Sequence, residues 1–171
     1  MPTDRQFETW RRWGWGGVLV GALILAVAIW WWMRPISVQT APGATATRTL
    51  PDGSTVELNA DTRLAYPRTF STISLLEEEQ RRVRLHGEAY IEVDEGERPF
   101  VVETTTARIE VLSTAFAVRS RSGDDDRTHV ALAEGRLRVE GKAAPEASVT
   151  LQPEQAVTMG SNGPVTAVRD T

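Results

Sequence analysis

Two patterns of apolar residues divide the chain, and they change over between residues 33 and 44. Residues 13–33 form a continuous apolar run that holds no charged side chain. From residue 44 onward, apolar and polar residues alternate with a period of two in short segments. The first pattern is typical of a transmembrane helix, because a bilayer core needs about 20 consecutive apolar residues. The second is typical of β-strands that have one buried and one exposed face.

The flanks of the apolar run also favour a transmembrane helix. Indole rings prefer the level of the lipid headgroups. All six tryptophans of the chain lie near the two ends of the run: Trp10, Trp13, Trp15, Trp30, Trp31 and Trp32. Three arginines lie in residues 1–12 before the run, whereas only Arg34 follows it closely. The positive-inside rule therefore predicts that residues 1–12 are a cytoplasmic stub and that the chain after Pro35 lies across the membrane.

A cleaved signal peptide is the alternative interpretation of the same run. Such a peptide has a shorter apolar core, and a small-residue cleavage site follows it. The Trp-Trp-Trp-Met-Arg-Pro sequence at the end of the run does not resemble such a site, although residues 40–44 leave the option open. Segment length and flanks favour a permanent transmembrane helix at residues 13–33 over a signal peptide.

The alternating segments predict an all-β domain over residues 44–159. The positions expected to be buried are Val56, Leu58, Val83, Leu85, Ala89, Ile91, Val93, Phe116, Val118, Leu137 and Val139. Turn signals such as Pro51-Asp52-Gly53 separate the segments, since proline presets the first turn angle and glycine accepts a positive one. A sandwich, a roll and a short solenoid all fit short strands at this spacing. We expect residues 34–43 to be a linker and residues 160–171 to be a fraying tail.

Two segments fit the β pattern less well. Residues 75–82 have a helix-forming composition, and we favour a solvated loop over a single helical turn there. Residues 120–128 contain Asp124, Asp125 and Asp126. They lack the alternating ligands and distal glutamate of a calcium loop, so we expect an exposed hairpin tip rather than a calcium site.

Composition excludes several classes of function. The chain has 171 residues and a net charge of −4, with acidic and basic residues interspersed. Nucleic-acid binding would require a basic stripe, so no nucleic-acid partner is expected. There is no cysteine, which excludes disulfides and thiolate metal sites.

One small cluster invites an enzymatic interpretation. His86 and Glu88 lie two residues apart on one expected strand face, and Glu92 follows on the same face. A metal site needs about three or four protein ligands, and His129 is the single other imidazole. No nucleophile motif accompanies these groups. We therefore predict no catalytic, cofactor or metal site, and expect Gly87 to mark a bend where the Glu88 carboxylate accepts a backbone amide.

The order of motifs resembles that of the FecR family, the membrane-anchored regulators of iron-uptake signalling. The matching segments are residues 50–54 (LPDGS), 56–59 (VELN), 83–93 (VRLHGEAYIEV), 98–102 (RPFVV), 111–118 (VLSTAFAV), 134–137 (EGRL) and 151–155 (LQPEQ). The resemblance implies a bacterial inner-membrane protein whose all-β domain lies in the periplasm. In the fuller members of the family, the periplasmic part binds a TonB-dependent outer-membrane receptor, and a cytoplasmic domain holds a sigma factor.

The chain departs from the fuller members of the family in three ways. Its expected cytoplasmic part is a stub, so any link to a sigma factor is expected to be indirect. It continues only briefly beyond the β domain, so a further receptor-binding domain is not expected. Ser113 stands where the family usually has glycine, and it would be strained if the backbone there requires a glycine-specific angle.

These features predict a membrane-anchored regulator, or anti-sigma factor, that works by protein–protein contact in transmembrane signalling. The expected partner is a TonB-dependent receptor or another envelope protein, bound by strand addition to a sheet edge. A basic face of Arg82, Arg84, Arg136 and Arg138 is the candidate partner site, although solvated strand faces commonly carry such charges. The alternative is a structural or envelope-binding module without signalling output.

Overall fold

The computed structural model describes residues 20–31, 34–70, 80–121, 126–160 and 162–170. The chain divides into two compact units, Met1–Arg34 and Pro35–Thr171. In the first unit, residues 20–31 form a helix. Its apolar side chains are exposed, and the Arg34 guanidinium lies 3.9 Å from the centroid of the Trp30 ring. The predicted stub at residues 1–12 lies outside the described residues.

The predicted transmembrane span extends beyond the helix that the structure describes. No helix among the described residues is both long and apolar enough to span a bilayer. Residues 13–19 and 32–33 of the predicted span are not among them.

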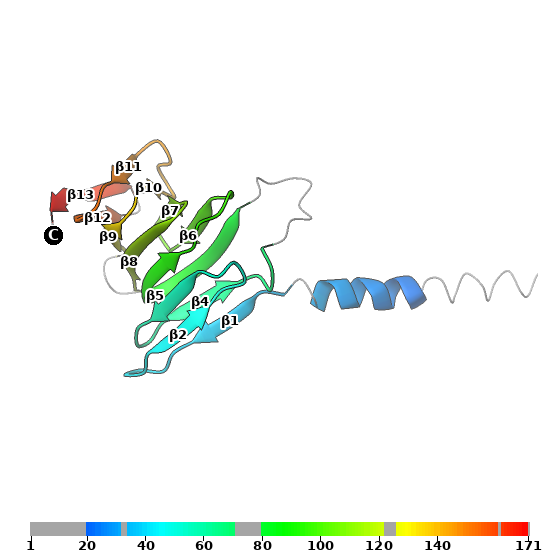
Figure 1. The fold of residues 1–171 in the computed structure, drawn as a ribbon. Coiled ribbons are helices and arrows are strands. Elements are labelled where there is room, and N and C mark those ends of the chain that lie inside the picture. Colours follow the sequence, from blue (N-terminus) through cyan, green and yellow to red (C-terminus); the bar gives the residue numbers. More distant parts are fainter. Residues whose placement is uncertain (1–19, 32–33, 71–79, 122–125, 161, 171) are drawn as a thin grey trace, which may run out of the picture. The chain divides into compact units, whose positions relative to one another are not determined.

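The described part of the second unit is one sheet of thirteen strands (Figure 1). The strands are β1 (Ile36–Gln39), β2 (Ala46–Thr49), β3 (Thr55–Leu58), β4 (Arg63–Tyr66), β5 (Arg81–Val93), β6 (Phe100–Glu103), β7 (Ala107–Val111), β8 (Thr114–Ser120), β9 (Thr128–Glu134), β10 (Leu137–Gly141), β11 (Ser148–Leu151), β12 (Gln155–Gly160) and β13 (Gly163–Asp170). The prediction of a mainly β domain is therefore confirmed.

The long strand β5 connects two halves of this sheet. Its first part pairs with β4 and, in parallel, with β6. Its second part pairs antiparallel with β3 and β8. We call the strands β1-β4-β5-β6-β7-β10-β11 the β6 half, and the strands β2-β3-β5-β8-β9-β12-β13 the β8 half.

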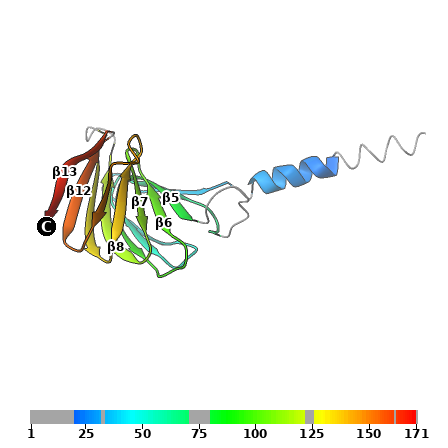
Figure 2. The same cartoon turned by 90° about the horizontal axis from the view of Figure 1, so that it is seen from above.

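The two halves curl toward each other on the side away from β5. Strands β10 and β11 lie beside β12 and β13, and Figure 2 shows the strands arranged around a common interior. A Cβ atom on Gly141 of β10 would lie 3.6 Å from the Cα atom of Gly163 on β13. The sheet is therefore rolled and barrel-like, which selects the roll among the predicted architectures.

The interior is filled by the positions that alternation predicted. Every residue expected to be buried is at most 6% exposed, including Val56, Ile91 and Phe116 at 0%. Such side chains supply the main favourable term of folding, because burial removes apolar surface from water. The predicted core is therefore confirmed.

The predicted domain boundaries differ from the strands that form. Strand β1 lies within the expected linker at residues 34–43 and pairs with β4, and Ile36 and Val38 pack against the core. Strand β13 lies within the expected tail at residues 160–171 and pairs with β12. Ile36 and Val38 alternate with polar residues, so the linker carries the same period-two pattern as the other strands.

Two expectations fall largely on residues that the structure does not describe. Residues 71–79 include most of the segment with helix-forming composition, so its helix and loop alternatives stay predictions. Residues 122–125 include Asp124 and Asp125. Strands β8 and β9 are antiparallel neighbours with Ser120 opposite Thr128, as expected for the arms of a hairpin.

Gly87 lies where β5 passes from one half of the sheet to the other. Its φ is +120°, and an added Cβ atom would lie 2.5 Å from the Thr62 hydroxyl oxygen. That hydroxyl accepts the Glu88 amide at 2.9 Å. The Glu88 carboxylate faces Arg121 at 3.5 Å, and the expected contact of this carboxylate with a backbone amide stays a prediction. Ser113 is not among the non-glycine residues with positive φ, so the predicted strain there is absent.

Candidate functional site

The four arginines of the predicted partner site share the outer face of the β6 half. Arg82 and Arg84 project from β5, Arg138 projects from β10, and Arg136 directly precedes β10. Strands β6 and β7 separate β5 from β10. The structure therefore places the arginines on one face but in two groups.

Carboxylates neutralise much of the charge of both groups. Glu103 on β6 lies 3.5 Å from the Arg82 Nε atom and 3.2 Å from the Arg84 Nε atom. The Arg138 Nε atom lies 3.0 Å from a Glu140 carboxylate oxygen. This face therefore carries arginine–glutamate ion pairs rather than a continuous positive charge. Partner binding at these arginines stays a prediction.

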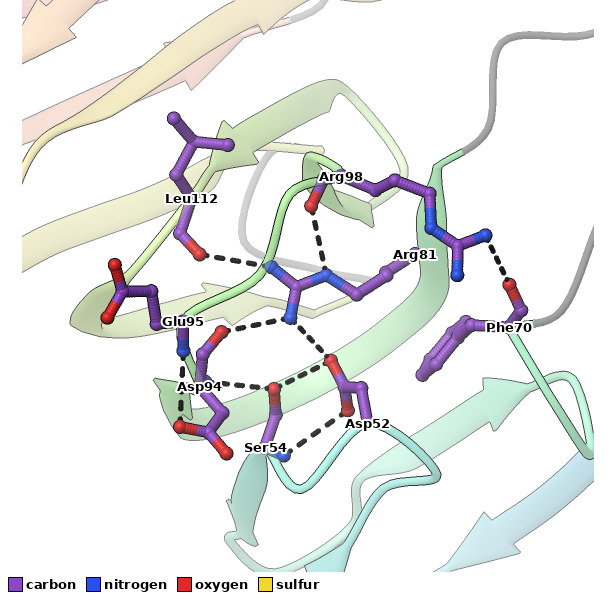
Figure 3. A network of polar contacts seen from close by, with 8 residues as sticks. All are labelled: Asp52, Ser54, Phe70, Arg81, Asp94, Glu95, Arg98 and Leu112. Atoms are coloured by element: carbon purple, nitrogen blue, oxygen red, sulfur yellow. Dashed lines mark hydrogen bonds and ion pairs between the residues drawn. The ribbon is translucent and has the colours of Figure 1, made fainter.

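A fifth arginine, which sequence reasoning did not single out, organises one end of the roll (Figure 3). Arg81 is 4% exposed. Its Nη1 atom donates to the Asp52 carboxylate and to the Asp94 carbonyl oxygen, both at 2.9 Å. Its Nε and Nη2 atoms each donate at 3.0 Å, to the Arg98 and Leu112 carbonyl oxygens respectively. The guanidinium thus ties together the β2–β3, β5–β6 and β7–β8 connections.

The surroundings of Arg81 fit it closely. The Asp52 carboxylate also accepts from the Ser54 amide and hydroxyl, at 3.2 and 2.8 Å. The Arg81 Cζ atom lies 5.6 Å from the Phe100 ring centroid. A Cβ atom added to Gly96 would lie 2.9 Å from the same Arg81 Cζ atom. A fully bonded buried ion pair of this kind is a structural element, so we assign the cluster to the stability of the fold.

The histidine and glutamates that invited an enzymatic interpretation are spread along β5. His86 lies opposite Arg63 in the β6 half, whereas Glu88 lies opposite Arg119 in the β8 half. Glu92 lies opposite Thr55. No group of three or more potential metal-ligating His, Cys, Asp or Glu side chains occurs in the described part of the chain.

A hollow of about 290 Å³ lies on the outer face of the β8 half, over β5, β8, β9 and β12. Its floor is a row of small residues. Ala117 lies opposite Ala131, and Ala131 lies opposite Ala156. Tyr90 continues the row on β5, opposite Ala117. Because the three alanines come from separate strands, only the pairing register brings them together.

A polar row forms one wall of the hollow. Glu88 lies opposite Arg119, Arg119 opposite His129, and His129 opposite Thr158. The His129 Nδ1 atom and the Thr158 hydroxyl oxygen are 2.9 Å apart. This hollow is an apolar floor beside a hydrogen-bonding wall, a combination common at binding sites.

Comparison with known proteins now identifies the family. The model of the FecR protein family matches residues 36–138, which cover most of the rolled sheet from β1 onward. The chain therefore belongs to the FecR family. No curated protein matches the chain significantly.

Two crystal structures of a candidate anti-sigma factor from Parabacteroides distasonis resemble the chain. They are 27% and 28% identical, with TM-scores of 0.67 and 0.68 over 80% and 79% of this chain. The matched part covers 60% and 59% of those chains, so this chain spans about three fifths of their length. The family and these neighbours support a regulatory role in signalling.

Proposed function

We propose that the chain is a non-enzymatic, single-pass regulator of the bacterial inner membrane whose FecR domain works in the periplasm. The observation that carries the proposal is the position of the family match, which begins at Ile36, directly after the apolar run at residues 13–33. The tryptophans and arginines around that run support the orientation.

The proposed partner is a TonB-dependent outer-membrane receptor or another envelope protein, and the output is an indirect effect on a sigma factor. The likeness to candidate anti-sigma factors supports this direction of signalling. The tagged full chain is cross-linked in cells, purified from membranes and analysed by mass spectrometry. We expect a receptor or envelope protein among the products, and recovery of neither would contradict the proposal.

A transcription measurement separates a regulator from a purely structural module. Deletion of the chain is expected to change transcription from the promoters of the sigma factor that it regulates. Recovery of an envelope partner together with unchanged sigma-dependent transcription would favour the structural module without signalling output.

The sheet offers an edge where a partner strand could be added. Strand β2 ends the β8 half, and Thr47, Arg48 and Thr49 are exposed. The Leu50 amide donates to the Ser54 carbonyl oxygen at 2.8 Å. Antiparallel alternation then directs the Ala46 and Arg48 amides toward β3 and those of Thr47 and Thr49 toward the edge. Outward amides of this kind can pair with an extended peptide.

A further inference from the structure

We propose that the β2 edge binds an extended acidic segment of another protein, in which a carboxylate side chain lies beside Arg48 and an apolar side chain lies beside Ala46. This inference rests on the proposed function, because it assumes that the domain works by protein–protein contact. It adds to strand addition at β2 the sequence pattern that the partner needs.

Arg48 is an exposed charge at the rim of the core. It lies opposite Val56, which lies opposite Ile91, and both of these apolar side chains are 0% exposed. Residues directly opposite each other share one face of a sheet, so the Arg48 side chain leaves β2 on the core side. In the part of the chain that the structure describes, no hydrogen bond or ion pair involves the Arg48 guanidinium. The open edge therefore carries a cation that nothing in this part of the chain neutralises.

The inward charge of Arg48 determines which strands can be added. Inward-pointing charged residues are one means by which edge strands resist unwanted pairing. An apolar partner side chain beside Arg48 would remove water from the guanidinium without replacing its hydrogen bonds, which is unfavourable. A partner carboxylate at the same place would form a charge-assisted pair with it. Arg48 therefore favours acidic segments and disfavours others, and both effects contribute to specificity.

The backbone of β2 sets the position of the carboxylate. An added strand hydrogen-bonds to the outward amides of Thr47 and Thr49, so Arg48 lies in a non-hydrogen-bonded pair, where opposite side chains are closest. Two residues away on the same face, Ala46 is half-buried and lies opposite the buried Leu58. An apolar partner residue beside Ala46 extends this buried row. In the antiparallel orientation, which is the more stable one, the partner sequence is therefore acidic-x-apolar.

A second copy of β2 does not satisfy this requirement. The strand Ala46–Thr49 contains no Asp or Glu, so pairing of β2 with its own copy places no carboxylate of that strand beside Arg48. In the register that aligns the two arginines, like charges lie directly opposite each other, which is destabilising. The occupant is therefore a segment of a different protein.

The test uses the purified full chain in mild detergent, isotope-labelled for NMR of its backbone amides. The probe is the capped peptide Thr-Thr-Glu-Thr-Val-Thr-Thr, in which Glu and Val have the required spacing. We expect saturable binding that slows hydrogen exchange of the Thr47 and Thr49 amides. Replacing the peptide Glu by Gln should weaken binding about two- to fivefold, the range expected for a cross-strand ion pair. Replacing the peptide Val by Ser should also weaken binding.

Variants at Arg48 connect the preference to its charge. Arg48→Gln should bind the Glu and Gln peptides equally, and Arg48→Glu should prefer a peptide with Lys in place of Glu. Arg63→Gln is the matched control, because Arg63 is an exposed arginine on β4, a strand that does not pair with β2. This control should keep the preference of the unchanged chain for Glu. Thermal unfolding confirms that each variant is folded.

Several results would each overturn the inference. One is the absence of slower exchange at the Thr47 and Thr49 amides, and another is equal binding of the Glu and Gln peptides by the unchanged chain. A preference for Glu that persists in Arg48→Gln would contradict the role of this charge. A concentration-dependent increase in particle mass that Thr47→Pro removes would show that β2 pairs with its own copy instead.

The cross-linking experiment in cells separates this inference from the proposed function. Capture of an envelope partner that Arg48→Glu does not reduce would overturn the acidic preference and leave the proposed function intact. Peptide binding with the expected charge preference, together with recovery of no envelope partner, would support the specificity of the edge and contradict the proposed function.

Discussion

At the scale of single residues, the buried Arg81–Asp52 pair is the interaction on which most contacts converge. The side chains of the two residues are 5% and 9% exposed. Removing one partner of a buried ion pair leaves the other charge without compensation, which is more costly than the pair itself is favourable.

The first prediction concerns that pair. Arg81→Met should lower the free energy of unfolding by about 3–5 kcal/mol, because Asp52 and three carbonyl groups lose their donor. Arg84→Met is the matched control, since the Arg84 side chain is 73% exposed and surface pairs contribute at most about 1 kcal/mol. Chemical denaturation measures both, and equal losses would show that the network does not stabilise the fold.

Arg81 also shows how far the sequence predicts a buried charged residue and its partners. It has the same strand parity as Val83 and Leu85 in β5, but the loop expected at residues 75–82 leaves it outside the alternating segment. A charged residue at an inward position predicts a buried partner. Its partners could not be predicted, because Asp52, Asp94 and Leu112 approach it only after three separate connections meet at one end of the roll.

At the scale of elements, β5 is the strand that both halves share, and Gly87 is the point of change. Alternation along β5 was predicted correctly from its apolar residues. The sequence did not predict that β5 pairs with β4 and β6 before Gly87 and with β3 and β8 after it. This change depends on which strands pair, and alternation along a single strand does not report pairing.

The second prediction follows from the backbone at Gly87. Gly87→Ala should destabilise the domain by about 2–3 kcal/mol, because a positive φ and contact with Thr62 both oppose a side chain. Gly43→Ala is the control, since Gly43 also has a positive φ, +79°, but no atom within 4 Å of an added Cβ. Thermal unfolding should therefore show a clearly smaller loss for Gly43→Ala, and a loss as large as that at Gly87 would argue against the close contact.

The third prediction concerns the β2 edge. Thr47→Pro removes an outward amide and should leave the fold intact while weakening capture of an envelope partner, since proline is tolerated on the open side of an edge strand. Arg48→Pro removes an amide that faces β3, so it should destabilise the sheet. Denaturation and cross-linking test the pair, and unchanged capture by folded Thr47→Pro would exclude strand addition at β2.

The strands β1 and β13 lie outside the bounds that the sequence predicts for the β domain, residues 44–159. Strand β1 has 4 residues and β13 has 8, and turn residues and chain position predict a linker and a tail for them. Pairing with β4 and β12 decides their state, and such long-range pairing outweighs local composition.

At the scale of the whole molecule, the hollow on the β8 half also depends on long-range strand pairing, which the local sequence pattern does not report. Alternation places Ala117, Ala131 and Ala156 on outward faces, yet it does not show that they are neighbours. Register across β8, β9 and β12 makes them one surface. The fold class, the core and the family could therefore be predicted from sequence, whereas the candidate binding surface required the structure.

The most direct test of the account is the side of the membrane on which the domain lies. The chain has no cysteine, so single cysteines introduced as Thr47→Cys and Thr3→Cys can be labelled selectively with an inner-membrane-impermeant maleimide. In intact cells, we expect labelling of the exposed Thr47 position, while the Thr3 position reacts only after the inner membrane is broken. Protection of the Thr47 position in intact cells, or recovery of the intact chain in the soluble fraction, would contradict a periplasmic domain held by a transmembrane helix.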